Sequence, residues 1–495
     1  MATFPLTRFR TAAEFARYAS EKYGTPYTYC LGVANSYIEE IENLEIACAV
    51  WSKLDTLRYS NSYANGALVR LPNELLLRNP INWNYYRNAF GIWTDDFNWN
   101  QYKPTSNKIY YVKSTGSDVA AGTETAPLKS LSVALAKTDS NQIIIDTRDG
   151  DYKMLGSWGW NNVQPTVSMS VQKIGAGRAM SLCTPGSTTS YPAWTLESGS
   201  IFKMTANLNS GYSATDLSIT DSDGFFHLQL IAASLGAMTA GTIFYDSGTT
   251  TLYCWALDSR NLIGDQNMIV SPQTNNIRIP SSALNFWVDG LDAIGGIPVQ
   301  FTSANTNRPK FTYMNAKIQS SHSASANNYN ILGGIDIFSY NIGSARARRD
   351  ALNYHGDSNG VPFGRESHCY TSTSGYVGTS DNSTTSHEGS CIHRDNGRYN
   401  LPLNRNCVDI DTTRNLYAGC YIGQPRTIAS AMELLTTSNT AKTWIADVTF
   451  EGGEDKQVCM TGTSAIYYDP DTMQMPIRSG TGEDTGTLGT WSVAG

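Results

Sequence analysis

The sequence predicts a mainly β protein, on three observations. Its 495 residues include 42 Gly and only 16% charged residues, a composition typical of turn-rich β proteins. Between residue 108 and about residue 466, short β-type runs are separated by Gly, Asn, Ser and Asp, and helical periodicity is almost absent after Lys137. A strand–helix–strand stretch at residues 110–152 stands at the start of this region.

The stretch at residues 110–152 is the part around which we expect the chain to be organised. It begins with a β-type run at 109–112 and a turn rich in Gly, Ser, Asp and Thr. Pro127 then precedes apolar residues spaced by three and four, which predict a helical face: Leu128, Leu131, Leu135 and Ala136. After a polar break, three consecutive isoleucines at 143–145 predict a buried strand, because the run is β-branched and too short for a buried helix.

This order of elements resembles the first coil of a right-handed parallel β-helix. The matching residues are Y-V-x-x-x-G-S-D at 111–118, G-T-x-x-x-P-x-x-S-L at 122–131 and D-G-x-Y at 149–152. In that fold the helix covers the open edge of the first rung. The fold family includes pectate lyases, polysaccharide epimerases and bacteriophage tailspikes. Short strands with frequent turns also suit a β-sandwich, and the cap stretch favours the solenoid.

Residues 1–107 are expected to form an N-terminal helical and aromatic-rich segment for attachment. Helices are predicted at 11–23 and 31–57, and the second carries a heptad-like stripe. That stripe suits either a helix packed on its own domain or a short bundle around a symmetry axis. The aromatic residues at 81–102 could stack on sugars or form a packed neck or interface, and we assign them to assembly.

The rest of the chain divides into a solenoid and a terminal arm. Residues 108–465 are predicted to form the β-helix, interrupted by a β-rich insertion at 198–261. Within the insertion, the runs at 240–246 and 251–255 predict a hairpin, similar to insertions between early coils of phage β-helix proteins. Residues 466–495 are polar and Gly- and Thr-rich, and they predict an arm that orders against a neighbour.

Charge and cysteine content exclude several classes of function. A net charge of −7 and a pI near 5.5 argue against nucleic-acid binding, which needs clustered cations. The nine Cys include no CxxC pair, and we expect neither a metal site nor a cofactor. Five of them lie in short apolar runs, and we interpret these five as buried apolar residues: Cys369, Cys391, Cys407, Cys420 and Cys459. The N-terminus has no apolar signal region and no stretch approaches the about 20 apolar residues of a membrane span, so we expect synthesis in a cytoplasm without a signal peptide.

The candidate site lies where histidines and acids cluster. Four of the six His fall between residues 355 and 393, among several Asp, Glu and Arg. Solenoid rungs of about 20 to 30 residues stack equivalent positions on one face. The steps of 22 residues from Glu366 to Glu388 and 21 from Glu388 to Asp409 therefore predict a shared groove.

Paired carboxylates are the requirement of glycoside hydrolysis. The candidate catalytic residues are Glu366, Glu388, Asp357, His355 and His387, and the candidate substrate-binding residues are Tyr354, His368, Tyr370, Arg394 and Asp395. A lyase reaction, with His355 or Tyr354 as base and Arg394 stabilising the uronate, is the alternative. Asn, His and Asp at solenoid turns also form side-chain ladders without any catalytic role.

The same region carries a second resemblance. Residues 350–355 are similar to the Asp-x-x-Asn-Tyr-His motif of a group of phage and bacterial β-helix proteins, which recurs with a later His-[Asp/Glu]-Gly motif, here within 383–389. They are also loosely similar to the Asp-Pro-His-Asp signature of alginate epimerases, with Asn353 and Tyr354 in place of Asp-Pro.

The resemblance implies a phage tailspike-like protein. It implies a homotrimer in the virion, attached to phage tail or baseplate proteins through residues 1–107. Its β-helix would bind and depolymerise a bacterial surface polysaccharide, either a capsule or a lipopolysaccharide O-chain. Hydrolysis is our first expectation, and a lyase or a non-catalytic receptor-binding fibre on the same scaffold are the alternatives. No nucleic acid and no membrane insertion are expected.

Overall fold

The computed structural model describes most of the chain from residue 67 onward. The described residues are 67–76, 83–87, 93–105, 108–137, 139, 142–156, 163, 165–185, 191, 193–208, 211–279, 283–303, 308–322, 326–372, 374, 383–400, 405–423, 433–452, 457–479 and 484–493, without the side chains of 383–388, 400, 405 and 406. The helices expected at 11–23 and 31–57 lie outside these residues.

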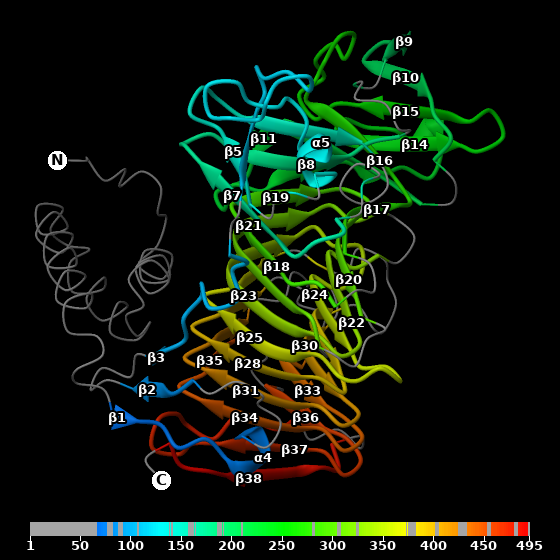
Figure 1. The fold of residues 1–495 in the computed structure, drawn as a ribbon. Helices are drawn as coiled ribbons and strands as arrows, with labels where there is room; N and C mark the ends of the chain where they lie inside the picture. Colours follow the sequence, from blue (N-terminus) through cyan, green and yellow to red (C-terminus); the bar gives the residue numbers. More distant parts are fainter. Residues whose placement is uncertain are drawn as a thin grey trace, which may run out of the picture.

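The chain winds into a right-handed parallel β-helix with three walls, which confirms the predicted fold class (Figure 1). The first wall is an eight-stranded parallel sheet. Its strands are β17 (Asn275–Ile279), β20 (Ile297–Thr302), β22 (Tyr329–Leu332), β24 (Leu352–His355), β27 (Ser383–Glu388), β30 (Arg405–Ile410), β33 (Leu435–Thr437) and β36 (Val458–Met460).

The second and third walls are formed by strands that follow one another around a corner. The second wall contains β4 (Ile109–Lys113), β5 (Gln142–Asp146), β7 (Met169–Ile174), β18 (Phe286–Asp289), the first halves of β21 (Lys310–Gln319) and β23 (Asp336–Ala345), β25 (Phe363–Ser367), β28 (Cys391–Asp395), β31 (Arg414–Ala418), β34 (Lys442–Ala446), β37 (Ala465–Tyr468) and β38 (Thr487–Thr490). The third wall contains β6 (Tyr152–Gly156), β8 (Ala179–Cys183), β19 (Leu291–Ile294), the second halves of β21 and β23, β26 (Tyr370–Ser372), β29 (Arg398–Asn400), β32 (Tyr421–Gly423) and β35 (Thr449–Glu451).

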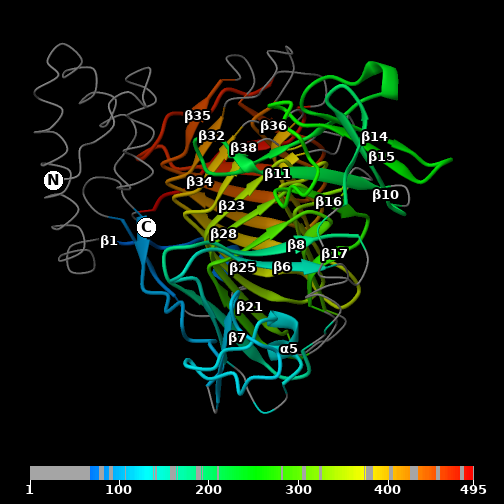
Figure 2. The ribbon, with the colours of Figure 1, turned by 90° about the horizontal axis from the view of Figure 1, so that it is seen from above.

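The helix α5 (Leu131–Leu135) lies at the N-terminal end of the solenoid, as the cap stretch predicts (Figure 2). Leu131, Ala134 and Leu135 are buried in the main apolar core together with Ile143 and Ile145 of β5. Because the edge strand of a sheet leaves backbone groups unpaired, a helix in this place shields the first rung from other chains.

The corner between the second and third walls is made by residues in the left-handed backbone region. On successive rungs they are Gly290, Asn315, Asn341, His368, Asn396, Gly419 and Asp447, with φ between 50° and 79°. Asn and Asp tolerate this conformation better than most residues. Asn341 donates to the amide oxygen of Asn315 at 3.0 Å, and Asn315 donates to Asp289 at 2.8 Å, so part of the corner is a side-chain ladder.

An inserted subdomain lies between β8 and β17 and projects from the N-terminal end of the solenoid (Figure 1). One sheet has the order β13-β14-β15-β10-β9, and a second has the order β12-β11-β16. The elements are β9 (Thr195–Ser198), β10 (Ile201–Thr205), β11 (Tyr212–Thr220), β12 (Phe226–Leu228), β13 (Leu230–Ile231), the 3₁₀ helix η2 (Leu235–Ala237), β14 (Thr242–Asp246), β15 (Thr251–Trp255) and β16 (Met268–Pro272). The antiparallel pair β14–β15 confirms the predicted hairpin.

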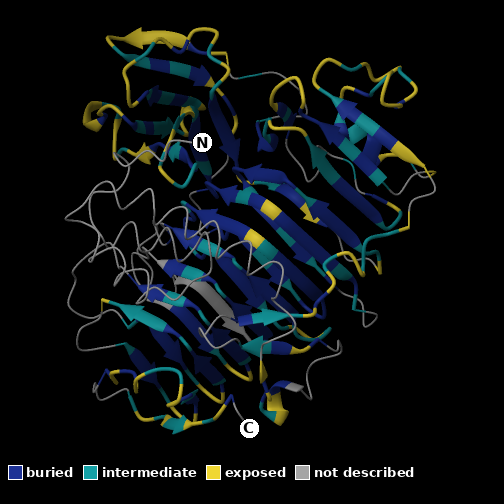
Figure 3. Cartoon of the chain, turned by 90° about the vertical axis from the view of Figure 1, so that its left-hand side faces the viewer, coloured by how far each residue is buried: buried dark blue, intermediate teal, exposed yellow. Residues whose placement is uncertain are grey.

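The described residues between 67 and 105, here called the N-terminal strap, lie on the outer face of the second wall (Figure 3). Its elements are β1 (Ala67–Leu68), α4 (Asn73–Leu76), β2 (Tyr85–Arg87) and β3 (Trp93–Asp95). The aromatic rings that we assigned to assembly pack within this chain, where Trp83 and Phe97 contact Phe338. Strap and wall share an apolar core, so the outer face of the second wall is buried along several rungs.

Asp447→Ala is expected to loosen the strap. Asp447, at the corner, accepts hydrogen bonds from Arg87 at 2.7 and 2.9 Å and from the Trp93 indole at 2.6 Å. Loss of charged hydrogen bonds that are partly buried should lower the free energy of unfolding by about 2 kcal/mol. Urea unfolding measures this, with Asp411→Ala as the control, because Asp411 has a similar φ of 59° and its carboxylate accepts a hydrogen bond from Asn439 of the solenoid. Equal losses in the two variants would contradict the prediction.

Candidate functional site

The predicted stacking of Glu366, Glu388 and Asp409 is wrong. Glu366 lies on β25 in the second wall, where its partner on the next rung is Arg394, 28 positions further on. Glu388 and Asp409 lie in the first wall, where Asp409 pairs with His387 and Glu388 pairs with Ile410. Rungs of unequal length and the division into walls therefore separate residues that a constant step places together.

Glu366 belongs to a polar cluster inside the solenoid. Its carboxylate accepts hydrogen bonds from the hydroxyls of Tyr354 and Tyr399, the second at 2.9 Å, and from Nε of Arg394 at 2.8 Å. The guanidinium of Arg394 lies over the ring of Tyr417, which donates to Asp409 at 3.3 Å. All of these side chains are buried. Glu366, Tyr354 and Arg394, which we expected at a substrate groove, are thus enclosed where a polymer cannot reach them.

Asp395 belongs to a second buried cluster, beneath the N-terminal strap. Arg365 donates to Asp95 of the strap and to Asp395, the latter at 2.5 Å. Burial raises the pKa of Asp395 to about 6, against the opposing effect of Arg365. His393 lies within 6.0 Å of the ring centres of Trp83, Tyr85 and Phe363. The predicted role of Asp395 in substrate binding is not compatible with this position, because the strap covers it.

His393 should make the stability of the protein depend on pH. Burial and the nearby Arg365 lower its pKa from 6.5 to about 3. Between these values the unfolded chain binds a proton that the folded chain does not, so stability falls as pH falls, by about 1.4 kcal/mol per pH unit. The raised pKa of Asp395 acts in the opposite direction between about pH 6 and pH 4.

We therefore compare the free energy of unfolding of His393→Phe with that of the native protein. The difference should favour the variant more at pH 4 than at pH 8. Urea unfolding at the two pH values measures the change. Asp395→Asn is the complementary variant, and it should lose relative stability at pH 4. A stability difference for His393→Phe that is the same at both pH values would contradict the assignment.

The remaining predicted residues are spread over the walls. His355 and Glu388 are register partners on β24 and β27, as are Tyr354 and His387, and the side chains of His387 and Glu388 lie outside the described residues. Asp357 is exposed and accepts a hydrogen bond from the backbone N–H of Asn359 at 2.7 Å, as in an Asx turn. His368 is a corner residue whose ring nitrogen lies 2.9 Å from the hydroxyl of Ser367.

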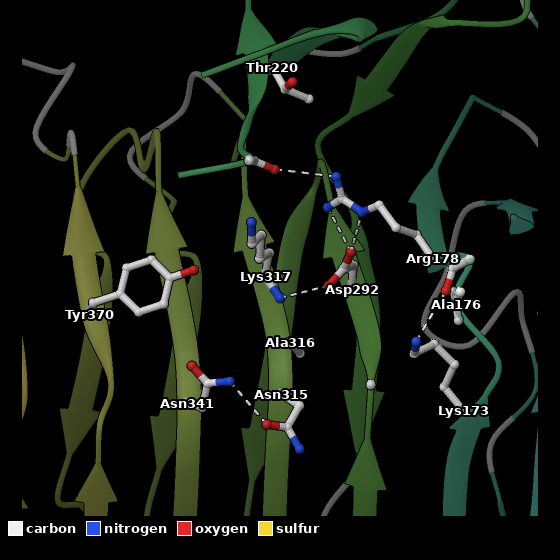
Figure 4. Close-up of a pocket in the computed structure, with 14 residues that line it drawn as sticks. Lys173, Ala176, Arg178, Thr220, Asp292, Asn315, Ala316, Lys317, Asn341 and Tyr370 are labelled. Atoms are coloured by element: carbon white, nitrogen blue, oxygen red, sulfur yellow. Dashed lines mark hydrogen bonds and ion pairs between the residues drawn. The ribbon is translucent and has the colours of Figure 1, made fainter. Parts of the chain in front are cut away.

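Tyr370 is the one predicted residue that lines a described cavity. This cavity, of about 430 Å³, lies on the outer face of the third wall and crosses successive rungs (Figure 4). Its lining residues are Lys173, Ala176, Gly177, Arg178, Ala179, Thr220, Gly224, Gly290, Asp292, Asn315, Ala316, Lys317, Asn341 and Tyr370. The corner ladder forms one side and the turn between β11 and β12 forms the other. We call it the flank pocket.

Three cations give the flank pocket its character. Lys173, Arg178 and Lys317 line it, and Asp292 is the one carboxylate among its lining residues. Arg178 donates to Asp292 at 2.7 and 2.9 Å. Burial lowers the pKa of Lys317, and the neighbouring Arg178 lowers it further. Burial raises the pKa of Asp292 in spite of Arg178. The pocket thus combines fixed positive charge with an amine that gives up its proton more readily than an ordinary lysine.

Tyr370 lies at one end of the pocket (Figure 4). The ring of Tyr370 lies 5.8 Å from that of Phe225, and burial raises the pKa of its phenol. Gly343, its partner on the preceding rung, leaves room for it, because a Cβ there would lie 2.4 Å from Cζ of Tyr370. Outward-facing Arg398 and Tyr421 follow Tyr370 in register on the next two rungs. Successive rungs are about 4.8 Å apart, so these side chains form a row along the solenoid axis.

Sequence reasoning missed Lys173, Arg178 and Lys317. Lys173 lies on β7, Arg178 directly precedes β8, and Lys317 lies on β21. The register of the third wall brings Asp292 and Lys317 to neighbouring positions. None of the three lies in a cluster of charge along the chain. No sequence signal marks them, because their proximity depends on the lengths of intervening rungs and of the inserted subdomain.

Metal and membrane sites are not found in the described part of the chain. No group of three or more His, Cys, Asp or Glu there is placed to hold a metal ion. The five cysteines that we interpreted as apolar residues are all buried, which confirms that interpretation, and the seven cysteines in the described ranges form no disulfide. Within the same ranges, none of the helices has the length and apolar character needed to cross a membrane.

No protein-family model matches the chain, and no curated protein matches it. Solved structures resemble it weakly. XylC in complex with xylose has 9% identity and a TM-score of 0.41, covering 73% of this chain and 68% of that one. A glycoside hydrolase has 9% identity and a TM-score of 0.40, with 78% and 96% covered. Pectate lyase Pel9A has 10% identity and a TM-score of 0.32, with 78% of each chain covered. Their activities are not transferred to this chain.

Proposed function

We propose that this chain is a β-helix protein that binds an acidic polysaccharide in the flank pocket and cleaves it by β-elimination. The observation that carries the proposal is the set of three cations and a tyrosine along the outer face of the third wall. The pocket crosses the strands, so a polymer chain can follow the solenoid axis across several rungs (Figure 4).

The chemistry follows from the charges. Arg178 and Lys173 would neutralise the carboxylate of a uronate, which stabilises the negative charge that develops when the C5 proton is removed. Lys317 would take that proton as general base, because its lowered pKa increases the fraction of neutral amine. The bond between C4 and the glycosidic oxygen would break as a C4–C5 double bond forms. Tyr370, kept protonated by its raised pKa, would protonate the leaving oxygen.

Hydrolysis is the second candidate, and Asp292 is the observation that favours it. Its raised pKa is what a general acid requires, and it lines the same pocket. Against this, Asp292 is engaged by two hydrogen bonds from Arg178. Hydrolysis also needs a second carboxylate, and the lining residues include none besides Asp292.

The deciding experiment incubates the purified protein with acidic bacterial capsules and with lipopolysaccharides. Shortened chains with a product that absorbs near 235 nm are the expected result. New reducing ends without that absorbance would indicate hydrolysis instead. Binding to an acidic polysaccharide without shortening would indicate a receptor-binding fibre, and absence of any binding across the panel would overturn the proposal.

We further propose a role in a phage tailspike. The support is the sequence resemblance of the cap motifs at residues 111–131, together with the helices that the sequence predicts at 11–23 and 31–57, before the strap. A tailspike of this type would be a homotrimer in the virion, bound to tail or baseplate proteins through residues 1–107. Light scattering on the intact protein tests the oligomeric state, where three chains of 54.1 kDa are expected and a monomer would contradict it.

A further inference from the structure

The flank pocket is bounded on one side by a turn that does not belong to the solenoid. This turn, residues 221–225, joins β11 and β12 of the inserted subdomain. Within it, the Asp221 carboxylate accepts hydrogen bonds from the backbone N–H of Asp223 at 3.0 Å and of Phe225 at 2.9 Å. The turn therefore has a defined shape of its own. We call it the acidic turn.

The acidic turn is attached to the third wall by the cations of the pocket and its surroundings. Arg178 donates to the carbonyl oxygen of Gly224 at 3.2 Å, and Lys317 donates to that of Asp223. Outside the pocket, Arg346 donates to the carboxylate of Asp221 at 2.7 Å. The two cations of the proposed reaction centre that face the turn are thus oriented by backbone oxygens of an element inserted between two rungs.

Gly224 is the point of closest approach. Its φ of +75° is in the region that favours glycine, and a Cβ at this position would lie 2.3 Å from Nζ of Lys317. That nitrogen is the end of a flexible side chain, so an added methyl group would displace the ammonium group and leave the backbone in place. The ring of Phe225, 5.4 Å from the same nitrogen, limits the directions in which it can move.

We propose that the acidic turn positions Lys317, through the Asp223 carbonyl oxygen and the space left by Gly224. This inference rests on the proposed function for its catalytic meaning. The inserted subdomain then completes the flank pocket, and Gly224 and Asp223 are positioning residues that act through Lys317. The carbonyl oxygen and the Phe225 ring fix the nitrogen at the pocket, while the absence of a side chain at 224 leaves it room.

Gly224→Ala tests this, and the chain offers a matched control. Gly264 has a φ of +76° in the same region of sequence, and a Cβ there would meet nothing within 4 Å. Both substitutions impose the same backbone strain, and only one meets Lys317. We expect Gly224→Ala to reduce the rate of chain cleavage about 10-fold or more relative to Gly264→Ala, with equal melting temperatures. Equal rates in the two variants would overturn the proposal.

Two further measurements separate positioning from a general structural effect. In a Lys317→Gln background, Gly224→Ala should reduce the cleavage rate by less than about 2-fold further, because the effects of substitutions at interacting residues are not additive. If Gly224→Ala still reduced the cleavage rate about 10-fold in that background, it would act through a residue other than Lys317. The pH at which cleavage reaches half its maximum should rise in Gly224→Ala, because an ammonium moved away from Arg178 and from its buried site loses the causes of its lowered pKa. An unchanged pH profile would contradict the proposal.

Crystal structures of Gly224→Ala and Gly264→Ala, without carbohydrate, make the test independent of the polysaccharide. Nζ of Lys317 should leave the Asp223 carbonyl oxygen only in Gly224→Ala. If the native protein cleaves no polysaccharide, the proposed function fails, and the position of Lys317 in these structures still decides whether the turn holds it. An unmoved Lys317 would overturn the inference even if cleavage were established.

Discussion

Lys317→Gln is expected to reduce the rate of polysaccharide cleavage by about 100-fold or more while the protein remains folded. General-base catalysis by a positioned side chain contributes about 100-fold to 10,000-fold, and Lys317 is the lining residue of the flank pocket whose amine has a lowered pKa. Glutamine retains an N–H that can donate to the Asp223 carbonyl oxygen, so the acidic turn should keep its partner. The measurement is the rate of appearance of the unsaturated product near 235 nm.

The matched control for this variant is Lys203→Gln. Lys203 lies on β10 of the inserted subdomain, is half-exposed and pairs with Glu197 at 2.6 Å, away from the flank pocket. It changes the net charge by the same amount, so loss of long-range attraction for an acidic polymer is matched between the two variants. Equal cleavage by both variants, with melting temperatures unchanged, would remove Lys317 from the mechanism and leave elimination without a base.

Glu366→Gln is expected to lower the free energy of unfolding by about 3 to 5 kcal/mol, because it removes the carboxylate that forms an ion pair with the buried Arg394. The side chains of both residues are almost completely inaccessible, 1% and 0% exposed, so the charge that remains cannot be compensated by water. Urea unfolding measures the loss. The protein that remains folded should cleave polysaccharide at the native rate, because the cluster does not line the flank pocket.

A paired replacement distinguishes a broken ion pair from a general loss of packing. Glu366→Leu combined with Arg394→Met removes both charges, and replacement of a buried ion pair by apolar groups is often neutral or stabilising. The double variant should therefore be more stable than Glu366→Gln alone. A cleavage rate that disappears in Glu366→Gln, at a temperature where the protein is folded, would return Glu366 to the active site and contradict its assignment to the interior.

The sequence allowed the solenoid to be predicted but not the site. The cap stretch ending in the isoleucines of β5 carries a local signal, and so does the β14–β15 hairpin, because each depends on residues close together in the chain. The constant step from Glu366 to Glu388 failed because the rung that contains Glu366 places it beside Arg394 in a different wall. Which residues become neighbours on adjacent rungs depends on the length of every loop between them. The number of residues between two positions does not show how they are divided among strands and loops.

His368 lies at a turn of the solenoid, the kind of position where we expected side chains with a structural role. It occupies a corner position shared with Asn341 and Asn396 on the adjoining rungs, all with positive φ. The three histidines between 355 and 393 whose side chains are described lie in three different places: His355 ends a strand of the first wall, His368 turns a corner and His393 lies beneath the strap. Tyr370 alone among the predicted residues lines the flank pocket.

The inserted subdomain has its own apolar core, formed by residues such as Trp194, Phe202 and Leu252. A second, smaller cluster joins the subdomain to the third wall, where Phe226 and Ile269 pack against Leu182. Sequence change within the subdomain core that leaves this contact intact should therefore not disturb the stacked rungs. Differences in ligand preference among related chains would then arise mainly in the acidic turn, which the inserted subdomain carries, while the rungs beneath it stay the same.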